Sequence, residues 1–156
     1  MDMTIRRAES GDSAGFAAVA NEVHEHHVAV IPGVFLSAPA AVWQGYFESL
    51  ISADETEIWV AEYNGEIAGY AVLQQRRTAG PMHAPRTFSF IDNFGVAKAY
   101  RRKGVARQLF EACVAVARER GDTTLELDCW EANQGALRFY EAMGMKTTRR
   151  RLALDL

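Results

Sequence analysis

Apolar and polar residues along the chain follow two periods that alternate from one end to the other. Alternating runs, rich in β-branched and aromatic residues, predict strands at residues 4–8, 58–63, 67–73, 88–96, 124–130 and 146–154. Apolar residues spaced three or four apart predict helices at residues 12–27, 39–51, 105–120 and 134–143. Strands and helices mixed in this order predict an α/β (α+β) architecture.

Residues with special backbone preferences mark the ends of several of these elements. Asn64 and Gly65 join two strand-like runs, and this dipeptide is typical of a type I′ hairpin turn, in which both residues have positive φ. Asp12 is expected to cap the first helix. Gly121 and Gly144 are expected to end the third and fourth helices, because glycine adopts the left-handed conformation that closes a helix.

Composition and charge limit the number of domains and the classes of partner that the protein can have. The 156 residues, 49% of them apolar, suit a single domain over residues 1–156, and no repeat or linker divides them. A formal net charge of -3, with both signs dispersed, provides no basic field for nucleic acid or an anionic membrane. No run approaches the ~20 apolar residues of a membrane-spanning helix, and the first residues lack the layout of a signal peptide. A cytoplasmic protein is expected.

The cysteines and histidines favour no metal site. Cys113 and Cys129 fall within apolar patterns and are expected to be free, buried thiols. His24 and His27 are one helical turn apart and His26 lies between them, but no further residue with ligand spacing completes a metal cluster. A substrate-side role for one of these histidines is favoured over a metal.

A strand-to-helix junction at residues 96–107 is the strongest candidate for a binding site. A helix that begins directly after a strand leaves several backbone N–H groups unpaired and directs the positive end of its dipole at one point, which suits a phosphate group. Gly104 and Ala106 keep these amides accessible, while Arg102, Lys103 and Arg107 can add positive charge. The alternative is a solvated basic turn before an ordinary surface helix.

Two motifs resemble those of the GNAT superfamily of N-acetyltransferases. The pattern R-x-x-G-x-A over residues 101–106 is similar to the family's Gln/Arg-x-x-Gly-x-Gly/Ala motif at a strand–loop–helix junction. The pattern N-x-x-A-x-x-F-Y-E-x-x-G-M over residues 133–145 resembles the second motif of the family, with Met145 where Phe is usual. The resemblance implies a central, mostly antiparallel twisted sheet, splayed between its fourth and fifth strands and flanked by about four helices.

The resemblance also implies acetyl-CoA as a cosubstrate, bound in the wedge between the splayed strands, and no metal. In the family, strand backbone at the positions of Phe94 and Val96 pairs with the pantetheine arm. Asn133 is implied as a further cofactor contact, although it also suits the N-cap of its helix. The cofactor-binding residues implied are Phe94, Gly95, Val96, Arg101, Arg102, Lys103, Gly104, Val105, Ala106, Arg107, Asn133 and Tyr140.

Transfer of the acetyl group by direct attack of an amine needs a proton donor and a base. The resemblance puts Tyr140 near the sulfur of CoA, where its phenol can protonate the departing thiolate; the alternative is a core aromatic residue. An amine with a pKa of ~10 must lose a proton before it can attack. Asp92 and Asp128, each within a predicted strand, are the candidate bases, unless they are solvent-facing or salt-bridged.

Asp92 ranks above Asp128 because it lies two residues before Phe94. Side chains two apart share a face of a strand, so a β-bulge near Asn93 would redirect the Asp92 carboxylate toward the splay.

The resemblance thus implies an N-acetyltransferase whose acceptor is a small-molecule or protein amine, and the composition and charge exclude nucleic acid and membranes as expected partners. The rival hypothesis is a non-catalytic acyl-CoA-binding sensor or scaffold with the same fold, which Tyr140 and the two candidate bases disfavour. The oligomeric state is left open, with a homodimer as one candidate.

Overall fold

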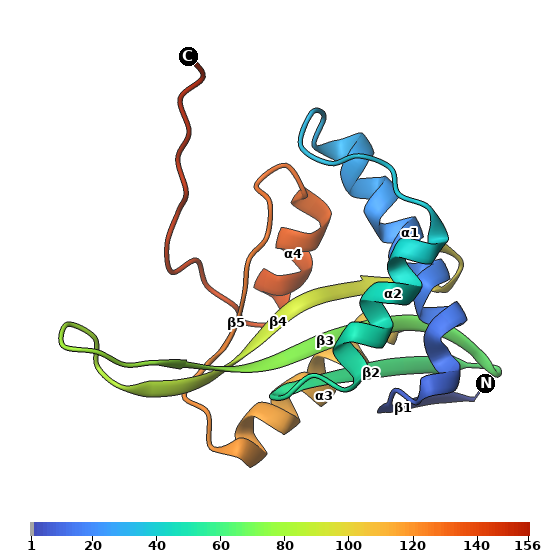
Figure 1. Ribbon diagram of the computed structural model, residues 1–156, viewed down its shortest axis with the longest axis horizontal. Coiled ribbons are helices and arrows are strands. Elements are labelled where there is room, and N and C mark those ends of the chain that lie inside the picture. Colours follow the sequence, from blue (N-terminus) through green and yellow to red (C-terminus); the bar gives the residue numbers. More distant parts are fainter. Residues whose placement is uncertain (1) are drawn as a thin grey trace.

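The computed structural model describes residues 2–156, which form a five-stranded sheet with helices on both faces (Figure 1). The strands are β1 (Met3–Arg7), β2 (Thr56–Tyr63), β3 (Glu66–Thr78), β4 (Arg86–Val96) and β5 (Leu125–Leu127). The α-helices are α1 (Ser13–Val30), α2 (Ala40–Ile51), α3 (Val105–Arg120) and α4 (Gln134–Ala142). Two short 3-10 helices are η1 (Ser10–Asp12) and η2 (Lys98–Tyr100). The predicted α/β class is therefore confirmed.

The strands lie side by side in chain order, β1-β2-β3-β4-β5. The first three pairs are antiparallel and β4 pairs with β5 in parallel. The parallel pair follows from α3, because a helical crossover returns the chain to the end of the sheet where β4 began. This topology confirms the mostly antiparallel sheet.

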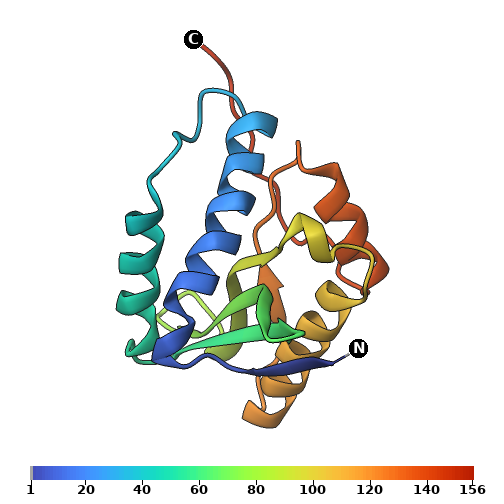
Figure 2. The ribbon, with the colours of Figure 1, turned by 90° about the vertical axis from the view of Figure 1, so that its right-hand side faces the viewer.

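Helices divide the two faces of the sheet between them (Figure 2). On one face, which we call the α1/α2 face, helix residues such as Phe16 and Phe47 pack on Tyr70 and Val72 of β3. On the opposite face, the α3/α4 face, Leu109 is fully buried among residues of the sheet. Alternate residues of β3 supply the two cores, as the two-residue period of a strand requires. Among the described residues, no helix is both long and apolar enough to cross a bilayer.

Several predicted boundaries are confirmed by the backbone. Asn64 and Gly65 both have positive φ, 51° and 82°, as a type I′ turn requires. Helix α3 ends at Gly121, whose φ is 75° and whose N–H bonds to carbonyls of the last helical turn. The hydrophobic period therefore located α3 to the residue.

Asp12 does not cap α1 with its side chain, contrary to prediction. Its carboxylate instead accepts two hydrogen bonds from Arg6, at 2.8 and 3.0 Å, and one from the backbone N–H of Glu9, at 2.7 Å. The bonds from Arg6 are the main reason that the pKa of Asp12 lies below its usual value. The carboxylate thus closes the η1 turn and ties it to β1.

Two predicted strands near the C-terminus differ from the structure. The strand expected at residues 124–130 is limited to Leu125–Leu127, because β4 and β5 pair only from Ser89 to Ile91. The strand expected at residues 146–154 is wrong, since all of 146–156 is exposed and forms no strand. The alternating pattern is present there, but no described strand pairs with it.

Gly95 allows α1 to pack directly on β4. A Cβ atom at this position would lie 2.6 Å from Cγ2 of Val23 on α1 and 3.1 Å from the ring of Tyr70 on β3. Atoms this close cannot coexist without movement of the helix or the ring, and overpacking of this kind costs about 1–3 kcal/mol. Glycine at this position therefore sets how closely α1 approaches the sheet.

Gly95→Ala is accordingly expected to lower the free energy of unfolding by about 1–3 kcal/mol in a urea titration. Gly135→Ala is the matched control, because a Cβ atom there meets open space in the first turn of α4 and alanine favours the helix. Equal stabilities for Gly95→Ala and the wild type would show that α1 moves aside freely.

Candidate functional site

The site begins where β4 and β5 separate. Their pairing ends at Ile91 and Leu127, yet β4 continues to Val96, still paired with β3 on its other side. Within residues 2–156, no strand pairs with the β5 side of β4 beyond Ile91. Backbone groups along this edge, which includes Phe94, Gly95 and Val96, are therefore open toward the wedge between the diverging strands. The predicted splay is confirmed.

Tyr140 lies between the two diverging strands. Its ring meets Phe94 of β4 edge-on, with 6.1 Å between ring centroids. Burial raises the pKa of Tyr140, and the negative charge of a nearby Cys129 thiolate, just beyond β5, would raise it further. The phenol therefore keeps its proton at neutral pH and can act as a proton donor within the wedge.

Asp92 is the extra residue of a β-bulge in β4. Val72 of β3 pairs with Asn93 and Leu73 pairs with Ile91, so Asp92 has no partner across the ladder. Ile91 and Phe94 both pack in the α3/α4 core, although strict alternation would separate residues three apart. A bulge is therefore present next to Asn93, where the sequence left one open, and it turns Asp92 and Phe94 toward opposite faces.

The carboxylate of Asp92 is held on the α1/α2 face by two side chains. Its Oδ2 accepts a hydrogen bond from the Tyr46 hydroxyl at 3.2 Å, and its Oδ1 lies 3.5 Å from Nη2 of Arg76. Burial and the charge of Asp92 raise the pKa of Tyr46 to about 12, which keeps that hydroxyl a donor. Asp92 is only partly buried, with 35% of its side chain exposed, so solvent can still reach it.

Asp128 has a different setting. It follows the last residue of β5, is exposed, and forms no hydrogen bond or ion pair with another residue of 2–156. The structure therefore does not bring Asp128 into the hydrogen-bonded group around Asp92, and its role stays a prediction.

The loop before α3 has the geometry expected of an anion site. Arg102 and Gly104 have positive φ, 61° and 80°, and no side chain caps the helix that starts at Val105. The N–H groups of its first turn, which includes Ala106 and Arg107, consequently lack intrahelical partners. A Cβ atom at Gly104 would meet no protein atom within 4 Å, so the space before these amides is open.

The basic side chains around this loop do not converge on the amides. Lys103 lies over the rings of Tyr63 and Tyr100, with its Nζ 5.2 and 5.6 Å from their centroids. Arg107 extends along α3 to Glu111, 3.5 Å away. Arg101 and Arg102 are exposed. The features of the predicted phosphate site are therefore the open backbone N–H groups and the dipole of α3. Among the described residues, no cluster of basic side chains surrounds these amides in this arrangement.

Asn133 joins α4 to α1. Its Oδ1 accepts a hydrogen bond from the backbone N–H of Ala136 at 3.3 Å, so it is the N-cap of α4, as anticipated. Its Nδ2 lies 3.5 Å from Nε2 of His27. Burial, together with the neighbouring His26 and His24, lowers the pKa of His27, so this ring is neutral at pH 7.

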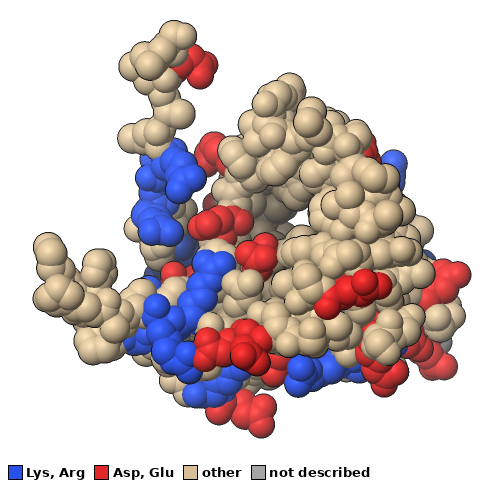
Figure 3. Space-filling view, in the orientation of Figure 1, with Lys and Arg blue, Asp and Glu red and all other residues tan. Residues whose placement is uncertain are grey.

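Aromatic rings bridge the mouth of the site on the α1/α2 side. Phe35, in the loop between α1 and α2, meets Trp130 beyond β5 edge-on at 5.7 Å, and it also contacts His24 and His27. We call the Phe35–Trp130 contact the aromatic bridge. The space-filling view shows a deep hollow between α4 and the α1/α2 side of the molecule, with acidic side chains along one rim (Figure 3).

The two thiols are poorly suited to nucleophilic chemistry. Both are free; Cys113 is buried as expected, while Cys129 is only half-buried. Burial raises the pKa of the Cys113 thiol to about 12 and also raises that of Cys129. A low thiolate content at neutral pH argues against an acyl-enzyme route.

Sequence reasoning missed the residues that support Asp92. Tyr46 and Arg76 lie on α2 and β3, respectively 46 and 16 positions away along the chain, and nothing in the local pattern of either marks it as functional. Tyr70 was missed as well, although its hydroxyl donates to Asn93 at 2.9 Å beside the bulge. An isolated buried tyrosine in a strand is ordinary core, so only the fold could connect these residues.

Comparison with curated proteins identifies relatives along most of the chain. The profile of the Acetyltransferase (GNAT) family matches residues 20–145. The uncharacterized N-acetyltransferase YhfO of Bacillus subtilis (strain 168) is 28% identical over 145 residues, 91% of this chain and 89% of that protein. YycN of the same strain, also an uncharacterized N-acetyltransferase, is 39% identical over 70 residues, 45% of this chain and 44% of that protein. This chain thus spans about half the length of several curated relatives that it matches.

Solved structures agree with this result. The tetramutant of protein BH1408 from Bacillus halodurans is 26% identical, with a TM-score of 0.93 over 98% of this chain and 99% of that one. The aminoglycoside N-acetyltransferase AAC(6′)-Iy, solved in complex with CoA, shares the fold at 19% identity, with a TM-score of 0.76 over 99% of this chain and 95% of that one. Because the family profile covers most of a chain that also has this fold, the protein belongs to the GNAT family of acetyltransferases.

Proposed function

We propose that this protein transfers an acetyl group from acetyl-CoA to a primary amine by direct attack in a ternary complex. The observation that carries the proposal is the position of Tyr140 between Phe94 of β4 and Cys129 beyond β5, inside the wedge where the strands separate. A proton donor at this point suits a leaving group that is released inside the wedge.

The residues around the wedge fit acetyl-CoA as a substrate. The open amides at the start of α3, in front of Gly104, suit the pyrophosphate. The unpaired edge of β4 at Phe94, Gly95 and Val96 offers backbone hydrogen bonds to the amides of the pantetheine arm. A cofactor held along this edge carries its thioester toward the point where the strands begin to separate.

In the proposed reaction the amine nitrogen attacks the thioester carbonyl, forming a C–N bond as the C–S bond breaks. The amine comes from the α1/α2 face and its proton passes to Asp92, directly or through water. The sulfur leaves as thiolate and takes the proton of Tyr140 on the opposite face, and solvent restores both groups. Tyr46 and Arg76 hold the Asp92 carboxylate in place for this step.

The acceptor side favours a cationic amine. Acidic side chains line the rim of the hollow beside α4, and a protonated amine is attracted to such a rim before it loses its proton (Figure 3). A non-catalytic acyl-CoA sensor on this fold would need the wedge but would not need a carboxylate and a phenol on opposite faces. This pairing is the reason to prefer the enzyme.

Acetyl-CoA at ~100 times its dissociation constant is expected to stabilise the fold by about 2.7 kcal/mol, measured as a rise in melting temperature. Gly104→Glu is expected to abolish the rise, because it puts a carboxylate against the phosphates. Gly121→Glu is the matched control: it also has positive φ and open space, but lies at the other end of α3. A wild-type melting temperature that millimolar acetyl-CoA leaves unchanged would contradict the assignment of this substrate.

Tyr140→Phe is expected to slow turnover by ~10²-fold at saturating substrates while acetyl-CoA binding stays intact, because it removes one proton-transfer group. The measurement is release of CoA thiol from acetyl-CoA in the presence of a mixed panel of amines. Tyr100→Phe is the control, since the Tyr100 hydroxyl donates to Glu66 and lies outside the wedge. Unchanged turnover for Tyr140→Phe would leave that residue with a packing role only.

Asp92→Asn is expected to lower turnover at neutral pH, with acetyl-CoA binding unchanged. Asp128→Asn is the matched substitution and is expected to have little effect, because Asp128 is exposed and forms no hydrogen bond with another described residue. The reverse result, an active Asp92→Asn and a crippled Asp128→Asn, would move the base to Asp128. If neither variant is impaired, water and backbone groups deprotonate the amine.

A further inference from the structure

Arg76 lies beside the candidate base Asp92, and one end of its guanidinium group is uncommitted. Its Nη2 is 3.5 Å from Oδ1 of Asp92, which exceeds the ~2.7–2.9 Å of a charge-assisted hydrogen bond. Its Nη1 makes no hydrogen bond or ion pair with any other residue of 2–156. Because 41% of the side chain is exposed, both N–H groups of Nη1 are available to a ligand that enters from solvent.

Neutral groups hold this guanidinium in one orientation. Nε and Nη2 of Arg76 donate to Oε1 of Gln74 at 3.1 and 2.8 Å, and Cζ lies 3.5 Å from the centroid of the buried Phe90 ring. Gln74 and Phe90 fix the position of the group without neutralising its charge. A guanidinium that is already ordered loses little conformational entropy when an anion binds to it.

The other arginines of β3 and β4 have close carboxylate partners. Nη1 of Arg86, on the same face of the sheet as Arg76, is 2.7 Å from Oε2 of Glu126. Arg77 follows Arg76 in β3, turns to the opposite face and pairs with Glu55. Arg76 is therefore the arginine of these two strands whose charge remains available beside the candidate base.

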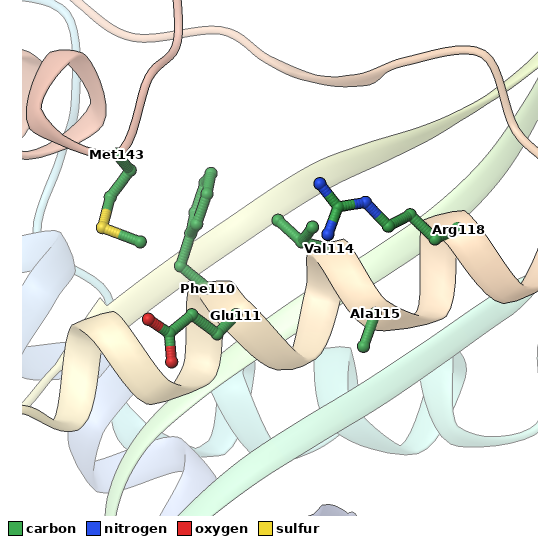
Figure 4. A pocket seen from close by; sticks show the side chains of 6 residues that line it. All are labelled: Phe110, Glu111, Val114, Ala115, Arg118 and Met143. Carbon is green, nitrogen blue, oxygen red and sulfur yellow. The ribbon is translucent and has the colours of Figure 1, made fainter.

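The groove on the α3/α4 face is not an alternative place for the acceptor. It has a volume of about 260 Å³, and Figure 4 shows Met143 opposite Phe110, with Val114 and Arg118 further along α3. Phe110, Val114 and Met143 pack on the α3/α4 core, whereas Asp92 lies on the other side of the sheet. An amine in this groove could not transfer its proton to Asp92. Recognition of the acceptor therefore depends on residues of the α1/α2 face.

We propose that the acceptor is a free α-amino acid whose carboxylate binds Arg76 while its amine faces Asp92. This inference rests on the proposed function and specifies its substrate class. An α-amino acid has both groups on one carbon atom, so it matches a guanidinium and a carboxylate that already lie in contact. The N–H groups of Nη1 donate to the substrate carboxylate, which orients the amine for attack.

The reaction is the proposed transfer with the amino group as the nucleophile. The ammonium loses one proton to become a neutral amine, and its nitrogen forms a C–N bond with the acetyl carbon as the C–S bond breaks. The nitrogen loses a second proton as the amide forms, and the departing thiolate takes up one proton. The products are an N-acetylamino acid, CoA with a free thiol and one proton released to solvent. The substrate carboxylate is unchanged, so Arg76 determines specificity and carries no proton.

Charge distinguishes this substrate class from two other kinds of amine. The N-terminus of a peptide has a neutral amide in place of the carboxylate, and it leaves the charge of Arg76 without a partner. A polyamine brings further positive charge, which Arg76 repels. The guanidinium therefore selects for a carboxylate next to the amine.

A row of aromatic rings leads from Asp92 to the mouth of the hollow and suits the side chain of the amino acid. The row begins with the tyrosine whose hydroxyl donates to Asp92, and neighbouring ring centroids along it are 5.0 to 6.0 Å apart. None of these rings is fully buried. An apolar or aromatic substrate side chain is therefore favoured over a charged one. The rings, in order, belong to Tyr46, Trp43, His24, Phe35 and Trp130.

Matched acceptors test the proposal: alanine, leucine and phenylalanine, each compared with its own carboxamide. The two members of a pair share the amine and the side chain and differ in the charge of the carboxyl group. We expect kcat/KM for release of CoA thiol to be at least ~10-fold higher for the acid with leucine and phenylalanine, because a hydrogen bond to a charged group has about this effect. The amine of the carboxamide loses its proton more easily, so basicity cannot explain a preference for the acid.

Arg76→Gln is expected to reduce this ratio to about 1, and Arg76→Lys, which keeps the charge but not the planar fork, to retain part of it. If Arg76 only positions Asp92, Arg76→Gln slows both members of a pair equally and leaves the ratio at its wild-type value, which would overturn the proposal. Arg77→Gln is the matched control and should keep the wild-type ratio, because Arg77 pairs with Glu55 on the opposite face. Cooperative melting checks that each variant is folded.

The outcomes separate this proposal from the proposed function. A wild type that acetylates the carboxamides as fast as the acids refutes the carboxylate site and leaves the acetyltransferase intact. If no amine releases CoA thiol, the proposed function fails, and calorimetric titration of phenylalanine into the protein with CoA tests the site alone. Binding that Arg76→Gln weakens by at least ~10-fold then supports the site, and an absence of binding overturns it.

Discussion

The architecture of the site depends on one residue that the β3–β4 ladder does not pair. In a regular strand every residue turns to the face opposite its neighbour, so one extra residue reverses the faces of all that follow. Asp92 is that residue in β4. Without it, Phe94 would turn away from α4 and Tyr140 would lose its contact with the Phe94 ring, while Asn93 could not meet Tyr70. The bulge therefore fixes the positions of the carboxylate, the phenol and the open strand edge together.

The two faces of the sheet have separate tasks under the proposed function. The open amides before α3 and the ring of Tyr140 belong to the α3/α4 side, whereas Asp92, Tyr46 and the histidines of α1 belong to the other. The wedge between β4 and β5 connects the two faces of the sheet. Gly95, packed under Val23, lets α1 lie close to β4 at the strand edge that borders this wedge.

Much of this fold follows from local patterns, and the exceptions have physical causes. The period of α3 and the Asn64-Gly65 turn depend on interactions a few residues apart, which a sequence displays directly. The length of β5 depends on how far β4 stays beside it, and residues 146–154 have a strand pattern without a strand beside them. Tyr46 and Arg76 could be assigned to the site only from the fold, because both contact Asp92 although they are far from it in the sequence.

The aromatic bridge between Phe35 and Trp130 affects how molecules enter the hollow. An edge-on pair of rings contributes only about 0.5–1.5 kcal/mol beyond its buried area. A contact of that strength breaks and re-forms readily under thermal motion, and it connects a loop to a segment beyond β5 rather than two rigid elements. The Phe35–Trp130 contact is thus a weak link across the mouth of the hollow. Under the proposed function, selection among acceptor amines would then depend more on the residues that line the hollow than on the size of its opening.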